Sequence, residues 1–244
     1  MKKLSVKDRV FISVTSLLTV SCLVLGAFLV NANVKKKAQQ EQITYMQQYY
    51  NNHVFAYGVE NANLSKGQIV FIGDSITDLY HLDDYYADLD KACYNRGIGG
   101  DKTTGVIDRL QVSLYDLEPS EVVLMIGIND LNSGRTVEEL SSLYQAILDG
   151  IKEHLPSSKV FTMSILPLND LLSGYFDINV QNQKVVETNT HIAQMANERG
   201  YTYVDLHSQM KDENGKLIAS YTDDGIHPNA NGYAVWTNLL KPLL

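Results

Sequence analysis

The chain has 244 residues, 45% hydrophobic and 20% charged, a composition typical of a globular protein and a length sufficient for one α/β domain. Residues 1–37 carry a net charge of +6, from seven Lys or Arg and one Asp, whereas the rest of the chain carries −14, from 13 basic and 27 acidic residues. Because nucleic-acid binding depends on cationic contacts, this acidic main part argues against a nucleic-acid partner.

An uncharged apolar run extends from Val10 to Val30, about the length that a helix needs to span a bilayer. Two interpretations are open. The run is either a cleaved signal peptide, with Ala32 as a small residue at the cleavage site, or an uncleaved anchor. We favour the anchor, because the run is longer than a typical signal-peptide core. In both cases we expect the rest of the chain to work outside the cytoplasmic membrane.

The segment after the apolar run, residues 35–57, is polar with interspersed aromatics and contains no Gly or Pro, which favours a helical stalk that then packs on the domain. The expected organisation is a short cytoplasmic tail, a membrane-spanning segment, a stalk or linker helix and a catalytic domain, over residues 1–9, 10–30, 31–64 and 65–244.

Short apolar segments alternate with helical ones from residue 68 onward. The predicted strands lie at 68–73, 91–100, 121–130, 159–167 and 201–206. Continuous apolar strands are typical of a sheet that is covered on both faces. Strands that alternate with helices predict a three-layer α/β fold around a mostly parallel, five-stranded sheet.

Three helices are predicted between and after these strands. The first covers 137–155, where Leu and Ile recur at helical spacing and Thr136 with Glu139 forms a capping box. The second covers about 181–199 and stops at Gly200. The third covers 228–240, with Pro228 expected at its first position.

Polar residues that are able to carry chemistry follow three of the strands. Ser75 follows the first, the glycine-rich segment 95–101 ends the second, and Asn129 follows the third. Because ligands bind at the carboxyl ends of parallel strands, these groups are expected to meet at one edge, together with His227 from far downstream. A hydroxyl, oxyanion donors, a base and a carboxylate are the parts needed for acyl transfer.

Ser75 is a weak nucleophile until a base takes its proton, and His227 is suited to that role. Asp224 lies three residues earlier, with Gly225 allowing a tight turn, so its carboxylate is able to orient the imidazole. Asp223 is the rival for that role. With Pro228 opening a helix, the helix dipole would help to keep His227 neutral.

An oxyanion must be stabilised during ester cleavage. The expected donors are the side-chain amide of Asn129, the backbone N–H of Gly100 and the N–H of Ser75 itself. Gly97 and Gly99 are turn glycines, and either is an alternative to Gly100 as the backbone donor.

Four blocks in this order resemble the SGNH hydrolases, also called GDSL esterases and lipases. The blocks are Gly73-Asp74-Ser75, Gly100, Gly127-x-Asn129-Asp130 and Asp224-x-x-His227. The segment NRGIGGD is similar to the subgroup of platelet-activating-factor acetylhydrolase catalytic subunits. The resemblance implies a flavodoxin-like α/β/α fold, a Ser75–His227–Asp224 triad and oxyanion donors at Gly100 and Asn129. We expect no cofactor and no metal.

Residues 168–179 are predicted to form a loop after the fourth strand, on the active-site edge. Its apolar side chains, Leu171, Tyr175 and Phe176 among them, are candidates for an acyl pocket or a lid, and burial under the domain is the alternative.

The function expected from these features is a membrane-anchored serine esterase that acts on small, acetyl-type esters of cell-envelope glycans or lysophospholipid-like lipids. An acyltransferase with the same triad is the nearest alternative. A metal-dependent phosphoesterase and a non-catalytic, membrane-tethered binding module also remain open.

Overall fold

The computed structural model describes the backbone of residues 5–244 and the side chains of residues 5–7, 28 and 30–244. The chain divides into two units, Met1–Tyr49 and Tyr50–Leu244. Helix α1 runs from Val6 to Asn61. The predicted membrane-spanning segment, 10–30, falls on this helix, but its side chains, apart from those of Phe28 and Val30, lie outside the described residues. Among the residues that are described, no helix is both long and apolar enough to cross a bilayer.

The second unit is built on a parallel sheet of five strands in the order β2-β1-β3-β4-β5, which is the order of doubly wound, flavodoxin-like folds. The strands are β1 (Ile69–Gly73), β2 (Cys93–Gly97), β3 (Glu121–Met125), β4 (Lys159–Met163) and β5 (Thr202–Val204). All five predicted strands are confirmed, each within the stretch expected from its apolar run. The buried patterns of β1 and β3 agree with a sheet covered on both faces.

The longer helices lie close to the ranges predicted from the sequence. The helices of this unit after α1 are α2 (Ser75–Asp78), α3 (Leu82–Tyr86), α4 (Thr103–Asp108), α5 (Leu110–Ser113), α6 (Ile128–Asn132), α7 (Val137–His154), α8 (Ile178–Arg199), α9 (His207–Met210) and α10 (Ala230–Leu240). Short 3-10 turns lie at Tyr115–Leu117, Asp170–Leu172, Ala219–Tyr221 and Lys241–Leu243. The capping box of Thr136 and Glu139 is present, and α8 ends at Gly200 in the left-handed conformation, as predicted.

The prediction for Pro228 is wrong. Helix α10 begins at Ala230, and Asn229 is its N-cap, with a side chain that accepts hydrogen bonds from the N–H groups of Asn231 and Gly232. Asparagine is among the best N-cap residues, so it sets the helix start two residues later than the proline suggested. His227 is therefore separated from the first turn of α10 and gains less from its dipole than expected.

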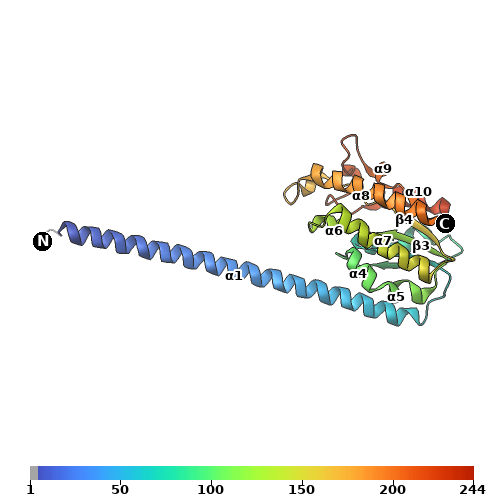
Figure 1. Cartoon of the computed structure of the whole chain (residues 1–244), viewed down its shortest axis with the longest axis horizontal. Coiled ribbons are helices and arrows are strands. Elements are labelled where there is room, and N and C mark those ends of the chain that lie inside the picture. Colours follow the sequence, from blue (N-terminus) through green and yellow to red (C-terminus); the bar gives the residue numbers. More distant parts are fainter. Residues whose placement is uncertain (1–4) are drawn as a thin grey trace. The chain divides into compact units, whose positions relative to one another are not determined.

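Helices cover both faces of the sheet, and the elements can be followed in Figure 1. On one face α7 lies beside α8, joined by a 2.8 Å hydrogen bond between Ser141 Oγ and His191 Nδ1. On the other face α10 packs on the segment after β1, where the rings of Tyr80 and Tyr233 stack with centroids 4.5 Å apart. The Tyr80 hydroxyl also bonds to Thr237 at 2.6 Å. The C-terminal helix is thereby fixed against the segment that follows Ser75.

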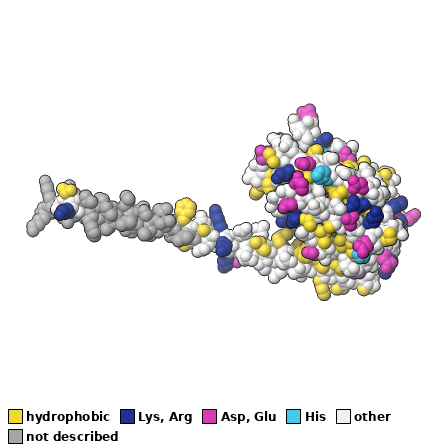
Figure 2. All heavy atoms as spheres, in the orientation of Figure 1, with side chains coloured by type: hydrophobic (Ala, Val, Ile, Leu, Met, Phe, Trp, Pro, Cys, Tyr) yellow, Lys and Arg dark blue, Asp and Glu magenta, His cyan; other side chains and the backbone are white. Residues whose placement is uncertain are grey.

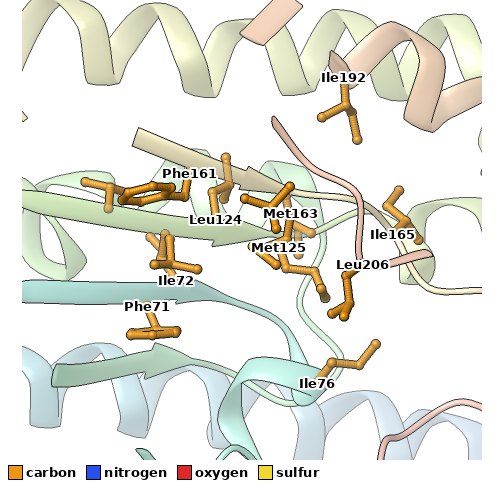
Figure 3. Close-up of a cluster of buried hydrophobic side chains, with 14 of the residues drawn as sticks. Phe71, Ile72, Ile76, Leu124, Met125, Phe161, Met163, Ile165, Ile192 and Leu206 are labelled. Atoms are coloured by element: carbon orange, nitrogen blue, oxygen red, sulfur yellow. The ribbon is translucent and has the colours of Figure 1, made fainter. Parts of the chain in front are cut away.

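The core lies between these layers and draws its side chains from β1, β3, β4 and α8. Figure 3 shows Phe71, Leu124, Met163 and Ile192 directed into it, and all four are fully buried. On the face of the molecule seen in Figure 2, Asp and Glu side chains are scattered among Lys and Arg over the domain. Burial of this apolar cluster fixes the strands, and the strands fix the edge where the polar residues meet.

Candidate active site

Ser75 lies directly after β1, at the start of the single-turn helix α2. Asp74 caps this helix, since its Oδ1 accepts a hydrogen bond from Ile76 N at 3.0 Å. Asp74 is almost completely buried, and burial raises its pKa to about 7, against the lowering effect of the Ile76 hydrogen bond. The cap thus holds Ser75 in a fixed orientation at the carboxyl end of a central strand.

His227 and Asp224 meet Ser75 at this edge of the sheet. Ser75 Oγ is 2.8 Å from His227 Nε2, and His227 Nδ1 is 2.6 Å from Asp224 Oδ2. The rival carboxylate, Asp223, contacts Asn229 Nδ2 at 3.3 Å. The structure therefore brings together the serine, the histidine and the aspartate that the sequence analysis favoured.

A tight turn places Asp224 under the imidazole. Gly225 has a φ of 95°, a conformation that other residues rarely adopt, and its N–H donates to Thr222 Oγ1. Asp224 Oδ1 accepts from the N–H groups of both Ile226 and His227 at 2.9 Å. These bonds use one carboxylate oxygen for the backbone and leave the other for the His227 ring.

The same bonds set the charge of Asp224. Partial burial raises its pKa, but hydrogen bonds from the His227 ring and from the N–H groups of His227 and Ile226 outweigh burial and lower the pKa to about 2. Asp224 is therefore ionised at neutral pH. An ionised carboxylate on Nδ1 fixes the tautomer in which Nε2 is free to accept the serine proton.

The predicted oxyanion donors lie in two neighbouring loops. The glycine loop, defined here as residues 97–101, leaves the end of β2, and Asn129 lies in α6 after β3. The register pairs Gly73 with Gly97 and with Met125, so both loops start level with the end of β1. Asn129 Nδ2 donates to the Asp101 carbonyl at 3.0 Å, which joins the two loops and leaves its second N–H for another acceptor.

The three glycines of this loop differ in what their N–H groups bind. Gly97 N donates to Asn95 Oδ1 at 2.8 Å, and Gly99 N donates to Asp78 Oδ2 at 3.0 Å. Gly100 is exposed, has a φ of 77°, and its N–H has no acceptor among the described residues. Gly100 is thus the glycine whose N–H is available to a ligand, and the alternatives Gly97 and Gly99 are not.

Buried charges that the sequence analysis did not identify hold the glycine loop. Arg109 is 1% exposed, and its Nε donates to Asp101 Oδ2 at 2.8 Å. The same guanidinium donates to the carbonyl oxygens of Arg96 at 2.8 Å and Gly73 at 2.9 Å. Burial raises the pKa of Asp101, and Arg109 opposes that rise. One side chain therefore ties the ends of β1 and β2 to the loop that follows β2.

Asp130 connects the start of α6 to the start of α4, which follows the glycine loop. It is fully buried and accepts from Thr103 N at 3.0 Å and from Thr103 Oγ1 at 2.8 Å. Arg135 Nε lies 3.0 Å from its Oδ1 and balances its charge. Because Asp130 is adjacent to Asn129, these bonds fix the asparagine relative to the start of α4.

A signal for Arg109 was present in the sequence. Val106, Leu110, Ser113 and Leu114 are buried at helical spacing, and Arg109 falls on the same face. A charged residue on a buried helical face requires a partner, and Asp101 is the carboxylate in the preceding loop.

The loop predicted to bind substrate lies only partly beside Ser75, His227 and Asp224. Asn169 N donates to the Gly225 carbonyl at 2.9 Å, and a Cβ on Gly225 would lie 3.1 Å from the Cβ of Leu171, which is 60% exposed. Tyr175 and Phe176 line a cavity of about 500 Å³ with neighbouring loop residues, and none of Ser75, Asp224 and His227 lines it. Of the three candidates, the structure places Leu171 near the turn that carries His227.

The metal-dependent phosphoesterase that the sequence left open requires several ligands arranged around one ion. Within the described part of the chain, no group of three or more His, Cys, Asp or Glu side chains is arranged to hold a metal ion.

Comparison with known proteins agrees with this geometry. Residues 71–235 match the GDSL-like Lipase/Acylhydrolase family. Platelet-activating factor acetylhydrolase IB subunit alpha1 of Pongo abelii is 29% identical over 180 residues, 72% of this chain and 75% of the relative. A Streptococcus pneumonia structure named after platelet activating factor aligns with a TM-score of 0.78 and 26% identity, over 84% of this chain and 97% of its own. The structure of a GDSL-like lipase from Bacteroides thetaiotaomicron aligns with a TM-score of 0.70 and 25% identity, over 80% of this chain and 97% of its own.

The fold, the strand-end residues and these matches define the class of protein as a carboxylic ester hydrolase. The chain belongs to the GDSL-like lipase/acylhydrolase family, which is the SGNH hydrolase family that the four sequence blocks resembled. The resemblance and the enzyme class are confirmed.

Proposed function

We propose that this chain is a serine esterase in which Ser75, His227 and Asp224 form a catalytic triad that acts on small acyl esters. The observation that carries the proposal is the 2.8 Å contact between Ser75 Oγ and His227 Nε2, across 152 residues of sequence. A nucleophile within hydrogen-bond reach of a base that a carboxylate orients is the defining arrangement of such enzymes.

The reaction proceeds through an acyl-enzyme. Ser75 Oγ attacks the ester carbonyl carbon while His227 Nε2 takes the hydroxyl proton. The ester C–O bond then breaks, and His227 returns that proton to the departing alcohol. Water attacks the acyl-serine carbonyl carbon and gives a proton to His227. The bond from that carbon to Ser75 Oγ then breaks, and His227 returns the proton to Ser75 Oγ as the carboxylic acid leaves. Asp224 stays ionised throughout and stabilises the imidazolium that forms in each half-reaction.

The N–H groups of Ser75 and Gly100 and the side-chain amide of Asn129 donate hydrogen bonds that stabilise the negative charge developing on the carbonyl oxygen. Each is a donor at the strand edge, and the buried bonds around Asp101 and Asp130 hold two of them in place before substrate arrives. Donors that are already oriented stabilise the transition state without reorganisation.

The exposure of the site favours a short acyl group on a larger carrier. The side chains of His227 and Asp224 are 29% and 52% exposed, so the triad lies on an open edge. A long acyl chain would need an apolar channel to leave water, whereas an acetyl group does not. Relatives named acetylhydrolase and a structural neighbour named as an acetyl-xylooligosaccharide esterase fit this size of acyl group. We propose acetyl esters of envelope glycans or of lysophospholipid-like lipids as substrates.

We further propose that residues 10–30 anchor the enzyme in the membrane with its catalytic domain outside the cytoplasm. The uncharged length of that segment supports the anchor, and cleavage near Ala32, which would release the domain, is the alternative. Cell fractionation with N-terminal sequencing of the mature chain decides between them.

The substrate proposal is tested with the full-length chain and the p-nitrophenyl esters of acetate, butyrate, octanoate and laurate, with Ser75→Ala as the control. We expect kcat/KM to be highest for acetate and to fall as the chain lengthens. A maximum at octanoate or laurate would contradict the short-acyl proposal. Acetylated glycan oligomers and an acetyl-bearing lysophospholipid, assayed for free acetate, then separate the two carriers, and transfer to a glycan hydroxyl without acetate release would instead indicate the acyltransferase.

A further inference from the structure

The last turns of helix α1 contact the strand that leads into the glycine loop. Tyr57 is 6% exposed, and its hydroxyl donates to the Gly97 carbonyl at 2.5 Å. Both residues belong to the unit Tyr50–Leu244. Gly97 is the last residue of β2 and the first of the glycine loop, three residues before Gly100.

The Gly97 carbonyl needs a donor from outside the sheet. Strand β2 pairs only with β1 among the described strands, so it is an edge strand, and the outward carbonyls of an edge strand have no ladder partner. Gly97 is buried, and a buried carbonyl without a donor costs free energy. The Tyr57 hydroxyl meets that requirement at the position where the loop begins.

Tyr57 is itself fixed by a buried cation. The guanidinium of Arg96 lies over its ring, 4.4 Å from the centroid. Arg96 in turn donates to Glu60 at 3.0 Å and to Asn61 at 3.1 Å, one turn further along α1. Burial raises the pKa of Tyr57, so its hydroxyl stays protonated and able to donate. The last turns of α1 and the end of β2 therefore form one packed unit around the hydroxyl.

The other restraints on the loop act at different atoms. Asn95 binds the Gly97 N–H, Asp78 binds the Gly99 N–H, and Arg109 binds the Asp101 carboxylate. Tyr57 is the donor that the structure shows for the Gly97 carbonyl. Removing it leaves the peptide between Gly97 and Ile98 held by the bond from Ile98 N to the Gly73 carbonyl at 3.1 Å, and so loosens the path of the backbone toward Gly100.

We propose that Tyr57 is a positioning residue for the reaction: its hydroxyl holds the Gly97 carbonyl and thereby fixes the loop that presents the Gly100 N–H to the acyl oxygen. This inference rests on the proposed function, because it assigns Gly100 to the oxyanion hole. It makes the C-terminal end of α1 part of the catalytic architecture.

The test compares Tyr57→Phe with the matched variant Tyr94→Phe in the full-length chain. The Tyr57 variant keeps the ring under Arg96 and loses only the hydroxyl. The Tyr94 hydroxyl binds the backbone N–H and carbonyl of Ser65 at 3.1 and 3.2 Å, toward the opposite end of β2 from the glycine loop. With p-nitrophenyl acetate we expect Tyr57→Phe to lower kcat about tenfold with KM changed less than about twofold, and Tyr94→Phe to leave both within about twofold.

Two further readouts separate positioning from a general loss of structure. The pH dependence of kcat/KM should keep its midpoint in Tyr57→Phe, because the contacts of Ser75, His227 and Asp224 are untouched. Hydrogen exchange, followed by mass spectrometry, should be faster than in the wild type for the peptide that covers the glycine loop, and unchanged in Tyr94→Phe.

The inference fails if kcat and loop exchange in Tyr57→Phe equal those of Tyr94→Phe, or if KM rises while kcat is unchanged. In those cases the wild-type chain still hydrolyses acetate esters, so the proposed function stands. A wild-type chain that neither hydrolyses any of the esters nor reacts with a fluorophosphonate at Ser75 overturns the proposed function and this inference together.

Discussion

His227 and Asp224 are three residues apart in one exposed turn, whereas Gly100 and Asn129 come from two different strand ends. The histidine half of the site is held by short-range bonds within residues 222–227. The oxyanion half is held by buried side chains from α1, α4, α6 and the junction between α4 and α5, with Arg109 and Asp130 fully enclosed. The first half is a local sequence feature, and the second is a property of the whole fold.

This contrast predicts that damage to the two halves has different consequences. Substitution of His227 should remove activity and leave stability almost unchanged. Substitutions in the supports of the oxyanion half should reduce stability as well as the rate.

His227→Ala should lower kcat roughly a millionfold, as expected when the base of a serine hydrolase is lost. Its side chain is partly exposed, so we expect the midpoint of thermal unfolding to stay within a few degrees of the wild type. His154→Ala, which removes an exposed imidazole stacked on Tyr115, is the control and should retain activity. Appreciable turnover by His227→Ala would show that another group acts as the base.

Arg109→Met should lower both the stability and the rate. It leaves the Asp101 carboxylate buried without its cation, which we expect to lower the free energy of unfolding by about 3–5 kcal/mol. Arg199→Met is the control, because its partner Asp149 is largely exposed, and it should cost less than about 1 kcal/mol. Urea unfolding measures both values, and equal losses in the two variants would contradict the structural role given to Arg109.

The pKa values of two carboxyl groups, one beside Ser75 and one beside His227, are shifted in opposite directions. The pKa of Asp74 is raised to about 7 by burial, above its ordinary value of 3.8, so the stability it contributes is present below about pH 4 and is lost as pH rises toward 7. The pKa of Asp224 is lowered to about 2, so its contribution is present above about pH 4 and is lost as pH falls toward 2.

Asp74→Asn isolates the first of these effects, because the amide oxygen can still cap α2. Between pH 4 and 7 the wild type should lose up to about 4 kcal/mol of unfolding free energy relative to the variant. Urea unfolding at a series of pH values checks this, and parallel curves for the two proteins would mean that Asp74 ionises as readily in the folded chain as in the unfolded one.

Asn129→Ala should lower kcat roughly a hundredfold with a smaller change in KM, because it removes one oxyanion donor. It also removes the bond to the Asp101 carbonyl, so some loss of stability accompanies the change in rate. Near-normal kcat for acetate esters would take Asn129 out of the oxyanion hole and leave Gly100 and Ser75 as its donors.

The parts of the molecule that sequence could predict are those set by local pattern. Apolar runs predicted β1 and β3. Apolar residues at helical spacing and a capping box predicted α7, and Gly200 predicted the end of α8. The position of Pro228 was predicted wrongly because two start signals were adjacent, and the Asn229 cap prevailed. Such competition is decided by hydrogen bonds that a single-residue preference does not contain.

The meeting of Ser75 with His227 was predicted from the residues at the strand ends, but the supports of the glycine loop were not. Arg109 bonds to Gly73, which is 36 residues away in the sequence, and Tyr57 bonds to Gly97, which is 40 residues away. Neither pair therefore forms a motif within one short segment. The substrate loop illustrates the same limit, since Leu171 lies near Gly225 while Tyr175 and Phe176 line a separate cavity. Contacts between distant segments become visible only when the sheet places them at one edge.

The central claim is that Ser75 is a nucleophile activated by His227. Its most direct test is reaction of the full-length chain with a fluorophosphonate, followed by mass-spectrometric mapping of the modified peptide, in the wild type and in His227→Ala. We expect one label, on Ser75, that is lost in the variant although the protein remains folded. A folded wild-type chain without label on Ser75, or with equal labelling in His227→Ala, would contradict it.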